Sequence, residues 1–335
     1  MSGLAGLNRL LWPIRYKPLP DELLSCWFIR LAHGHGLKVQ TFSNLLFGQR
    51  RQVWNRDVDR LGSPWLIEEL SLRTGTPFEV AERTCIRTLE GTLFSSFKLS
   101  GTLPWVLSMG MYHRKHTAFG MQYCPTCLAT DQVPYYRRTW RLAFMTVCPT
   151  HEVMLHDRCP QCASPLSFHR AEMGRGGLDD ALEMVMCHAC GMDLRQSPVQ
   201  PVKAYNSEIH DWLLTMAAGG VNALELDDWN VMRHLSRLIV TDVSHLKLHQ
   251  HLCRKIGAPE WPIPEGRVSI ELCELELRHH LSQLIGFLML DLQGGMEDAW
   301  RSRAIRFNHM LKDFNNAPPS YERVVSRFMH WRDRL

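Results

Sequence analysis

Four short motifs decide the fold of this chain: Cys124-Pro-Thr-Cys127, Cys148-Pro-Thr-His151, Cys159-Pro-Gln-Cys162 and Cys187-His-Ala-Cys190. In each motif two residues separate two Cys or His side chains, so a tight turn directs both ligand atoms toward one point. Zinc prefers four such ligands in a tetrahedron, and two motifs therefore complete one site. Chance does not explain four correctly spaced motifs within residues 124–190. The sequence predicts two zinc ions.

The spacing of the motifs favours a sequential pairing, because about 20 residues separate the two motifs of each site and only seven residues join the sites. The first ion is then held by Cys124, Cys127, Cys148 and His151, and the second by Cys159, Cys162, Cys187 and Cys190. An interleaved cross-brace, in which the first and third motifs share an ion, stays open from spacing alone. Four protein ligands leave no position for water or substrate, so both ions are expected to be structural.

Three enzyme motifs are incomplete or absent. His151-Glu152 begins like the H-E-x-x-H motif of zinc proteases, but the next histidine is His156, one residue too late. No H-x-E precedes the C-x-x-C motifs, as it does in zinc deaminases, and no phosphate-binding G-x-x-x-x-G-K-[ST] loop occurs. We therefore expect no catalytic residue and predict that the chain is not an enzyme.

The other cysteines and a histidine pair are expected to be structural. Cys26, Cys85, Cys253 and Cys273 are isolated among apolar residues, where a thiol usually packs into the core. The pair His279-His280 has no acidic or cysteine partner at a recognised metal-binding spacing, so we expect it to be exposed on a helix.

Length and composition indicate a folded protein of two or three units. The chain has 335 residues, of which 45% are hydrophobic and 21% charged, as in ordinary globular proteins. The net charge is +4, and residues 1–123 hold 15 Lys and Arg against 9 Asp and Glu. So small a basic excess neither requires nor excludes a nucleic-acid partner.

No segment is predicted to span a membrane. The longest apolar run, Leu284 to Leu290, is far shorter than the roughly 20 residues needed to cross a bilayer. Residues 1–11 contain Arg9 and no clear cleavage site, so we expect no signal peptide. A cytoplasmic protein with reduced thiols is predicted.

The N-terminal region shows helical patterns. Residues 21–33 carry apolar side chains at helical spacing behind Asp21, a plausible helix cap. Ser63-Pro64 opens a helix to Arg73, and the capping box of residues 76–79 opens another that ends near Gly91. The turn between these two helices is short, at residues 74–76. A turn of this length is typical of a helix-turn-helix, and also of plain antiparallel packing.

Two arginine pairs are candidate contacts with a nucleic-acid backbone. Arg50 and Arg51 follow a predicted helix end, where a solvated loop explains them equally well. Arg137 and Arg138 lie in an aromatic and basic run inside the first zinc module, where they can instead help to pack that module.

The remainder of the chain is predicted to be helical, with helices at 206–217, 227–254, 269–292, 297–312 and 319–334. We therefore expect a mainly α fold with small zinc-binding modules. Its three regions are an N-terminal helix-turn-helix-like region at 1–122, tandem zinc knuckle or ribbon modules at 123–196, and a C-terminal helical domain at 197–335.

One order of motifs resembles a known family. The stretch at 18–32, Pro-Leu-Pro-Asp-Glu-Leu-Leu-Ser-Cys-Trp-Phe-Ile-Arg-Leu-Ala, is followed by Tyr123-Cys-Pro-Thr-Cys127, by Tyr-Tyr-Arg-Arg-Thr-Trp-Arg at 135–141, and by Cys148-Pro-Thr-His151. This order resembles the TniQ family of bacterial transposition proteins. The similarity covers roughly residues 15–195, and the C-terminal helices match the family only in character.

The resemblance implies a non-catalytic target-selection factor in DNA transposition. Such proteins link target recognition to an AAA+ regulator, TnsC or TniB. In CRISPR-associated transposons they bind the RNA-guided Cascade complex as a homodimer and act at the bacterial nucleoid. Other members read a DNA attachment site directly and usually have a longer C-terminal region. The short chain favours the adaptor, with the direct DNA-binding selector as the alternative.

Overall fold

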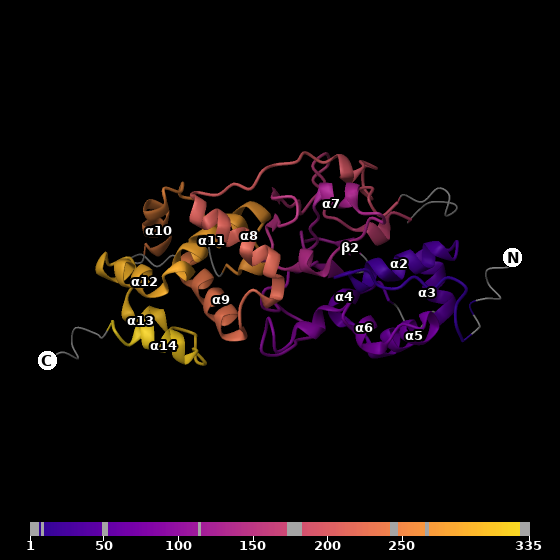
Figure 1. The fold of residues 1–335 in the computed structure, drawn as a ribbon, viewed down its shortest axis with the longest axis horizontal. Helices are drawn as coiled ribbons and strands as arrows, with labels where there is room; N and C mark the ends of the chain where they lie inside the picture. Colours follow the sequence, from indigo (N-terminus) through magenta and orange to yellow (C-terminus); the bar gives the residue numbers. More distant parts are fainter. Residues whose placement is uncertain are drawn as a thin grey trace.

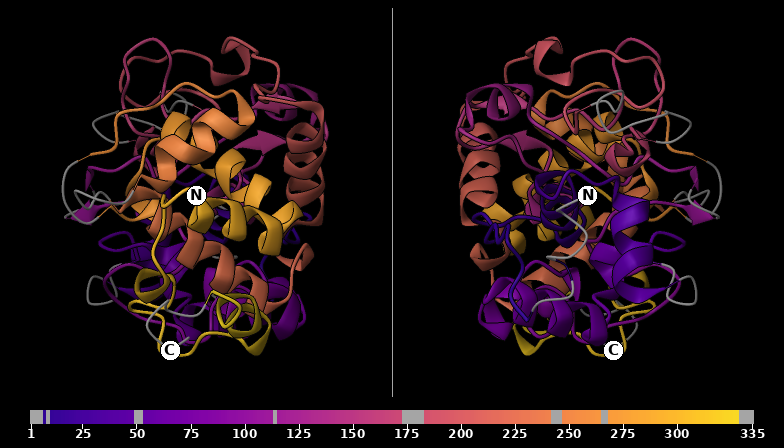
Figure 2. Two further views of the ribbon diagram at one scale, coloured as in Figure 1. Left: turned by 90° about the vertical axis from the view of Figure 1, so that its left-hand side faces the viewer. Right: turned by 90° about the vertical axis from the view of Figure 1, so that its right-hand side faces the viewer.

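The structure is a computed structural model that describes residues 7, 10–48, 53–112, 115–172, 183–241, 247–264 and 268–328. The molecule is elongated, with the N-terminal helices at one end and the C-terminal helices at the other (Figure 1). Helix α7 (Pro125–Thr130), which carries the first zinc motif, lies beside the N-terminal helices, above α2 (Leu24–Gly34) in the view of Figure 1. Views along the long axis show each helical group end-on (Figure 2).

Helix α2 is the most buried of the N-terminal helices and packs against α3 and α4. The elements are α2 (Leu24–Gly34), α3 (Val39–Phe47), α4 (Val58–Leu61), α5 (Pro64–Thr74), α6 (Phe78–Glu82) and a 3-10 turn (Ile86–Leu89). Helix α2 buries residues on every side, including Trp27, Phe28 and Leu31. A helix that is apolar on all faces belongs inside a core, and α2 therefore organises this half of the molecule.

The predicted cap of α2 was wrong. The helix begins after Leu23, which makes no side-chain cap. Asp21, with a left-handed φ of 57°, instead turns its carboxylate to residues 138 and 139. There it accepts hydrogen bonds from the Thr139 backbone N–H and hydroxyl, at 3.0 and 2.6 Å. The carboxylate that the sequence assigns to a helix end thus joins α2 to the zinc-binding region.

Helix α6 is shorter than predicted. The helix ends at Glu82, and the hydroxyl of Thr76, expected in a capping box, lies 2.7 Å from that of Thr74 instead. The chain turns at Thr84. The Thr84 hydroxyl donates to the Ala81 carbonyl, and the Thr84 carbonyl accepts a hydrogen bond from the Leu24 N–H. Packing against the start of α2 therefore ends the helix early.

Short elements make up the middle of the chain. They are β1 (Met111–Tyr112) paired with β2 (Lys115–His116), α7 (Pro125–Thr130), a 3-10 turn (Arg138–Arg141), β3 (Val147–Cys148) paired with β4 (Val153–Met154), and 3-10 turns at Phe168–Arg170 and Leu194–Gln196. Both pairs are antiparallel. In the second pair Val147 lies opposite Met154 and Cys148 opposite Val153, so the second motif begins in β3 and ends in the turn of this hairpin.

The C-terminal helices pack around α11. They are α8 (Ser207–Gly219), α9 (Leu226–Val240), α10 (Leu248–Ile256), α11 (Leu275–Leu290), α12 (Leu292–Arg301), α13 (Phe307–Met310) and α14 (Pro319–Val325). Helix α11 contacts α8, α9, α10 and α12. Gly286 lets α11 and α8 approach each other closely, because a Cβ atom at this position would lie 2.6 Å from the ring of Trp212 on α8. The fold is thus mostly helical, as predicted, but two of the expected helices are divided: 227–254 into α9 and α10, and 297–312 into the end of α12 and α13.

The expectation of an exposed histidine pair on α11 was wrong. His279 and His280 are 5% and 1% exposed. Because helices surround α11, both of its faces are buried. His279 lies 2.7 Å from the Lys203 carbonyl oxygen and 2.9 Å from the Thr146 hydroxyl, so it bridges α11 to the middle of the chain.

The C-terminal helices are joined to the rest by buried polar contacts. Arg278 is fully buried and donates to the Ala143 carbonyl and to the Gln122 side chain, at 3.1 Å each. The Trp105 indole donates to the Trp229 carbonyl at 3.0 Å. Within the described ranges, no helix is both long enough and apolar enough to cross a bilayer.

Candidate metal centres

The first cluster has the dimensions of a tetrahedral zinc site. Cys124, Cys127, Cys148 and His151 place their ligand atoms within 4.8 Å of one another. The Cys127 and Cys148 sulfur atoms are 3.6 Å apart, and His151 Nδ1 lies 3.3–3.6 Å from the three sulfur atoms. Zinc bonds of about 2.3 Å to sulfur and 2.0–2.1 Å to nitrogen give edges of about 3.8 Å and 3.6 Å. The residues therefore fit a zinc ion with Nδ1 of His151 as its nitrogen ligand.

Two different local structures present these four ligands. Cys124 precedes α7, and its sulfur accepts from the Cys127 N–H at 3.4 Å, so the ligand also caps the helix. Pro125 suits the first helical position because the N–H that proline lacks would have no partner there. Of the other two ligands, Cys148 is the last residue of β3 and His151 lies in the turn before β4, where the Glu152 N–H donates to the Cys148 carbonyl at 2.8 Å.

The second cluster joins Cys159, Cys162, Cys187 and Cys190. The sulfur atoms of Cys159 and Cys190 are 3.6 Å apart, and those of Cys162 and Cys187 are 3.7 Å apart. Both distances match the edge of a four-sulfur tetrahedron. The structure therefore has the sequential pairing, and the two clusters are consistent with two structural zinc ions.

The two knuckles of the second centre have the same backbone geometry. The Ala163 N–H donates to the Cys159 carbonyl and the Gly191 N–H to the Cys187 carbonyl, both at 2.9 Å. Ala163 and Gly191 have left-handed φ angles of 56° and 76°. Each turn is thus closed by the residue after the second cysteine, although only one of the two is the glycine that favours this conformation.

Local hydrogen bonds favour one thiolate in each cluster, whereas hydrogen bonding to Cys124 raises the pKa of Cys127 and burial raises that of Cys187. Hydrogen bonds from Cys124 and Cys127 lower the pKa of Cys148 far below its ordinary value. Burial by itself raises the pKa of Cys162, but hydrogen bonds from Ser164 and the neighbouring thiols bring it down to about 6. Zinc binds thiolates, so both arrangements suit the metal. With four protein ligands each, the ions stabilise the fold and offer no open coordination position.

A buried arginine holds the first zinc module to the N-terminal helices. Arg141 is 0% exposed and donates to the Asp57 carboxylate at 2.6 Å and to the Asp59 carboxylate at 3.4 Å. Asp59 also accepts from the Ser25 N–H at 2.7 Å and the Ser25 hydroxyl at 2.8 Å. Burial raises the pKa of Asp59 to about 6 against the opposing charge of Arg141. These contacts join α2, α4 and the module through one shared cluster.

The predicted nucleic-acid contacts fall into two groups. Arg50 and Arg51 lie outside the described residues. Arg137 forms an ion pair with Asp131 at 2.8 Å and lies over the rings of Tyr135 and Trp140. Arg138 pairs with Asp21 at 3.3 Å. Both described arginines are thus part of the packing around the first centre, and their contact with nucleic acid stays a prediction.

The helix-turn-helix-like pair consists of α5 and α6. Gly75 has a φ of 62° in the turn, which suits a left-handed helix end. Helix α6 has the sequence Phe-Glu-Val-Ala-Glu and exposes Phe78 and Val80 at 37% and 40%. Helix α6, the second helix of the pair, therefore presents apolar and acidic side chains to the surface.

A third group of possible metal ligands was missed in the sequence. His249, Cys253 and His280 also place their ligand atoms within 4.8 Å of one another. The available signal was the spacing His249-x-x-x-Cys253, which puts two ligand types on one helix face. The third ligand comes from α11, whose histidine pair the sequence predicts to be exposed, so the spacing on α10 alone does not indicate a metal site.

Residues 13–155 of the chain match the TniQ family and form a TniQ family domain. Proteins of this family are transposition-associated and generally non-catalytic. The domain takes in helices α2 to α7 and the whole first zinc centre, and it ends just before the second. No curated protein matches the chain.

Proposed function

We propose that this chain, on the premise of its TniQ domain, is a non-catalytic target-selection adaptor in DNA transposition. In this role it binds a target-recognition complex, with an RNA-guided Cascade-type complex as the expected partner. It then recruits the AAA+ regulator of the transposon, and it acts as a homodimer in the bacterial cytoplasm. The observation that carries the proposal is the domain match together with the surface of α6.

The residues that carry the family resemblance hold the domain together. Asp21 reaches residues 138 and 139, the Tyr136 N–H donates to the Cys26 sulfur at 3.4 Å, and Arg141 joins Asp57. None of these side chains is arranged around an open metal or a nucleophile. A domain fastened in this way serves as a fixed scaffold that presents surfaces to partners.

The surface of α6 favours a protein partner over direct DNA reading. A recognition helix in the major groove uses Arg, Lys, Asn or Gln to read base edges, and phosphates repel carboxylates. Helix α6 offers Glu79 and Glu82 together with exposed Phe78 and Val80. Leu72 on α5 is also 50% exposed. Exposed apolar side chains of this kind suit a protein interface, with α5 and α6 contributing to it.

Recruitment of the AAA+ regulator tests this proposal. The purified chain should retain the regulator of its own transposon on DNA in the presence of ATP, together with the target-recognition complex. The double variant Phe78→Asp, Val80→Asp should lose recruitment while keeping its zinc, because exposed side chains contribute little to folding. The matched control is Leu99→Asp, which changes a 68% exposed side chain that lies on neither α5 nor α6 and lines a pocket with Arg60 and Leu61 of α4. Equal recruitment by all three proteins would contradict the role of this surface.

The alternative function is direct sequence-specific binding of target DNA. The 15 basic against 9 acidic residues of 1–123 favour it, and Arg50, Arg51, Arg137 and Arg138 are its proposed contacts. The adaptor is expected to bind naked duplex weakly and with steep salt dependence. Protection of one defined sequence at physiological salt by the chain alone would establish the selector instead.

The absence of strand cleavage is part of the same proposal. Labelled DNA incubated with the chain and Mg²⁺ or Mn²⁺ should stay intact, because zinc centres with four protein ligands provide no activated water. Cleavage that disappears on substitution of one of the chain's own acidic residues would overturn the non-catalytic role.

A further inference from the structure

Helices α10 and α11 bring together three potential metal ligands outside the TniQ domain. His249 and Cys253 lie four residues apart on α10, so their side chains share one face of that helix. His280 reaches the same point from α11. Cys253 and His280 are 0% and 1% exposed, while His249 is half-buried at the edge of the group.

The distances within this group are close to those of a tetrahedral site. Cys253 Sγ lies 3.5 Å from His249 Nε2 and 3.8 Å from His280 Nε2. A zinc ion bound by one sulfur and one nitrogen sets an edge of about 3.6 Å between them. From this geometry we infer that His249, Cys253 and His280 form a third metal site that binds a zinc-type ion and clasps α10 to α11.

The two imidazoles must separate slightly when the ion binds. Their Nε2 atoms are 2.8 Å apart, which is a hydrogen-bond distance, whereas two nitrogen ligands of zinc lie about 3.3 Å apart. Without the metal, the Nε2–H of one ring donates a hydrogen bond to Nε2 of the other; with the metal, both Nε2 lone pairs face the ion. An adjustment of about 0.5 Å is small for side chains on two helices.

The neighbours of His280 orient it for this role. The Tyr205 hydroxyl lies 2.9 Å from His280 Nδ1, and a hydroxyl that accepts the Nδ1 proton leaves the Nε2 lone pair free for the metal. The Trp261 ring stacks on the imidazole with centroids 5.6 Å apart and an angle of 23°. A hydrogen bond on the far nitrogen is the usual support of a metal-binding histidine.

The local charge also suits a cation. The carboxylate of Glu260 lies close enough to act electrostatically on both His249 and Cys253. A Cys253 thiolate and the nearby Glu260 carboxylate would offset the two positive charges of the ion. Three protein ligands leave the fourth position to a water molecule.

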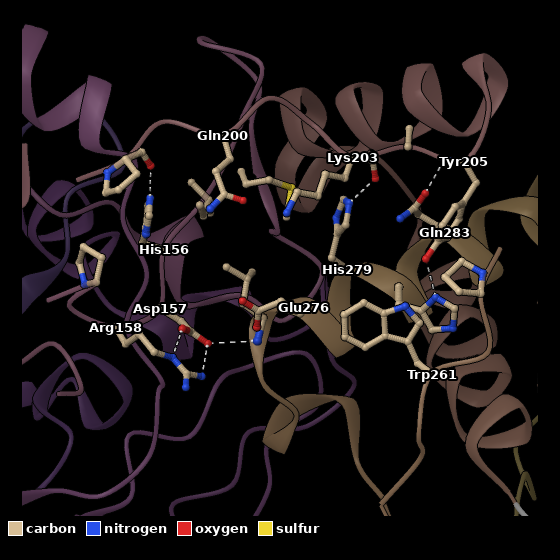
Figure 3. Close-up of a pocket in the computed structure, with 18 residues that line it drawn as sticks. His156, Asp157, Arg158, Gln200, Lys203, Tyr205, Trp261, Glu276, His279 and Gln283 are labelled. Atoms are coloured by element: carbon tan, nitrogen blue, oxygen red, sulfur yellow. Dashed lines mark hydrogen bonds and ion pairs between the residues drawn. The ribbon is translucent and has the colours of Figure 1, made fainter. Parts of the chain in front are cut away.

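A cavity gives the ion a route to His280. A pocket of about 500 Å³ is lined by His280, Tyr205, Trp261 and Gln283 at one end and by Asp157 and Arg158 at the other. Figure 3 shows Tyr205, Trp261 and Gln283 grouped together, away from Asp157 and Arg158 across the pocket. The site is therefore buried without being sealed.

A hydrogen-bonded pair of histidines is the simpler explanation of the group. It accounts for the contact between His249 and His280, but it assigns no role to the Cys253 thiol that lies near both Nε2 atoms. Thiolate and imidazole together are a ligand set that suits zinc, cobalt and copper. The presence of the thiol is what makes the group a metal site.

Zinc content of the full-length chain tests the inference. Protein equilibrated with Zn²⁺ and freed of unbound metal should contain about three equivalents. Cys253→Ser and His280→Gln should each lower this to about two, with an unchanged far-ultraviolet circular dichroism spectrum. The matched control is Cys273→Ser, because the Cys273 thiol donates to the Ser269 carbonyl at 3.4 Å and is not one of the three ligands, so the zinc content should stay unchanged.

Cobalt provides a second measurement that does not depend on counting. Co²⁺ bound to the wild-type chain should show a thiolate-to-cobalt absorption that is weaker in the Cys253→Ser variant by the contribution of one sulfur. Two zinc equivalents in the wild type, or equal zinc content and equal cobalt spectra in the wild type and Cys253→Ser, would overturn the inference.

Discussion

The two zinc centres have similar ligand geometry but lie in different surroundings. In the first, all three cysteines are buried, and the module around them is joined to α2 and α4 through Asp21 and Arg141. In the second, Cys162 and Cys190 are exposed. Its contacts with the N-terminal helices run through Glu172, which accepts from the Val39 N–H at 2.7 Å, rather than through the ligands. The first ion should therefore stabilise the whole TniQ domain, and the second mainly its own loops.

The largest expected difference lies in the loss of a ligand. Cys148→Ser should release the first zinc and unfold the TniQ domain cooperatively, because the binding energy of a structural zinc is folding energy. Cys162→Ser should release one zinc and leave the helical core folded. Zinc content and thermal unfolding monitored by circular dichroism measure both effects. Two variants with equal loss of helical signal would remove the distinction between the centres.

The charge clusters beside the two centres provide the next comparison. Arg141→Met leaves Asp57 and Asp59 without their buried cation and should lower the free energy of unfolding by about 3–5 kcal/mol. Near the second centre, Arg195 pairs with Asp193 at 2.8 Å but is 36% exposed on its side chain. Arg195→Ala should cost less than about 1 kcal/mol. Urea unfolding measures the loss of stability in each variant, and equal losses in Arg141→Met and Arg195→Ala would contradict the account.

Acid should destabilise the C-terminal helices through buried histidines. Burial lowers the pKa of His234 to about 4, and its Nε2 lies 2.6 Å from the Met310 carbonyl oxygen. A lowered pKa means that the unfolded chain binds more protons between about pH 6.5 and 4, so this stabilisation is present above pH 6.5 and is lost as the pH falls. From pH 7 to 5, His234 should account for about 2 kcal/mol of lost stability.

A titration of stability against pH checks this assignment. His234→Phe keeps a ring to stack on Phe314, whose centroid is 4.3 Å from that of His234, but cannot titrate. The variant should be less stable at pH 7 because the bond to Met310 is lost, and its stability should fall less between pH 7 and 5. An unchanged pH dependence would assign the acid sensitivity to other groups.

The smallest expected effect concerns the knuckle turns of the second centre. Ala163 has a left-handed φ that glycine adopts without strain, so Ala163→Gly should strengthen zinc retention by up to about 1 kcal/mol. Gly191→Ala should weaken it by a similar amount, because the strain comes from φ alone and a Cβ atom there has open space. Competition with a chelator measures both, and changes of the same sign would contradict this explanation.

Sequence alone predicted the parts of the fold that depend on local spacing. The two four-residue zinc clusters, the helical regions on either side of them and α5 with its Ser63-Pro64 start all follow from short-range patterns. The buried leucines at 281, 284 and 288 on α11 follow from helical periodicity.

Tertiary contacts explain what the sequence could not predict. The sequence predicts that Asp21 caps a helix, but in the structure its carboxylate accepts a hydrogen bond from Thr139, which lies 118 residues later. The burial of His280 depends on α10 and α8 packing against α11, and no periodicity within α11 reveals that. The cluster of Arg141, Asp57 and Asp59 likewise joins charges that look like separate surface residues in the sequence.

The rate at which each centre loses its zinc to a chelator tests the central claim most directly. In the Cys253→Ser background, release should be biphasic: the exposed second centre should empty first with no change in helical content, and the first should empty slowly, together with unfolding of the TniQ domain. Adding Cys162→Ser should remove the fast phase alone. A single phase for both ions, or a fast phase accompanied by loss of helical structure, would contradict the account.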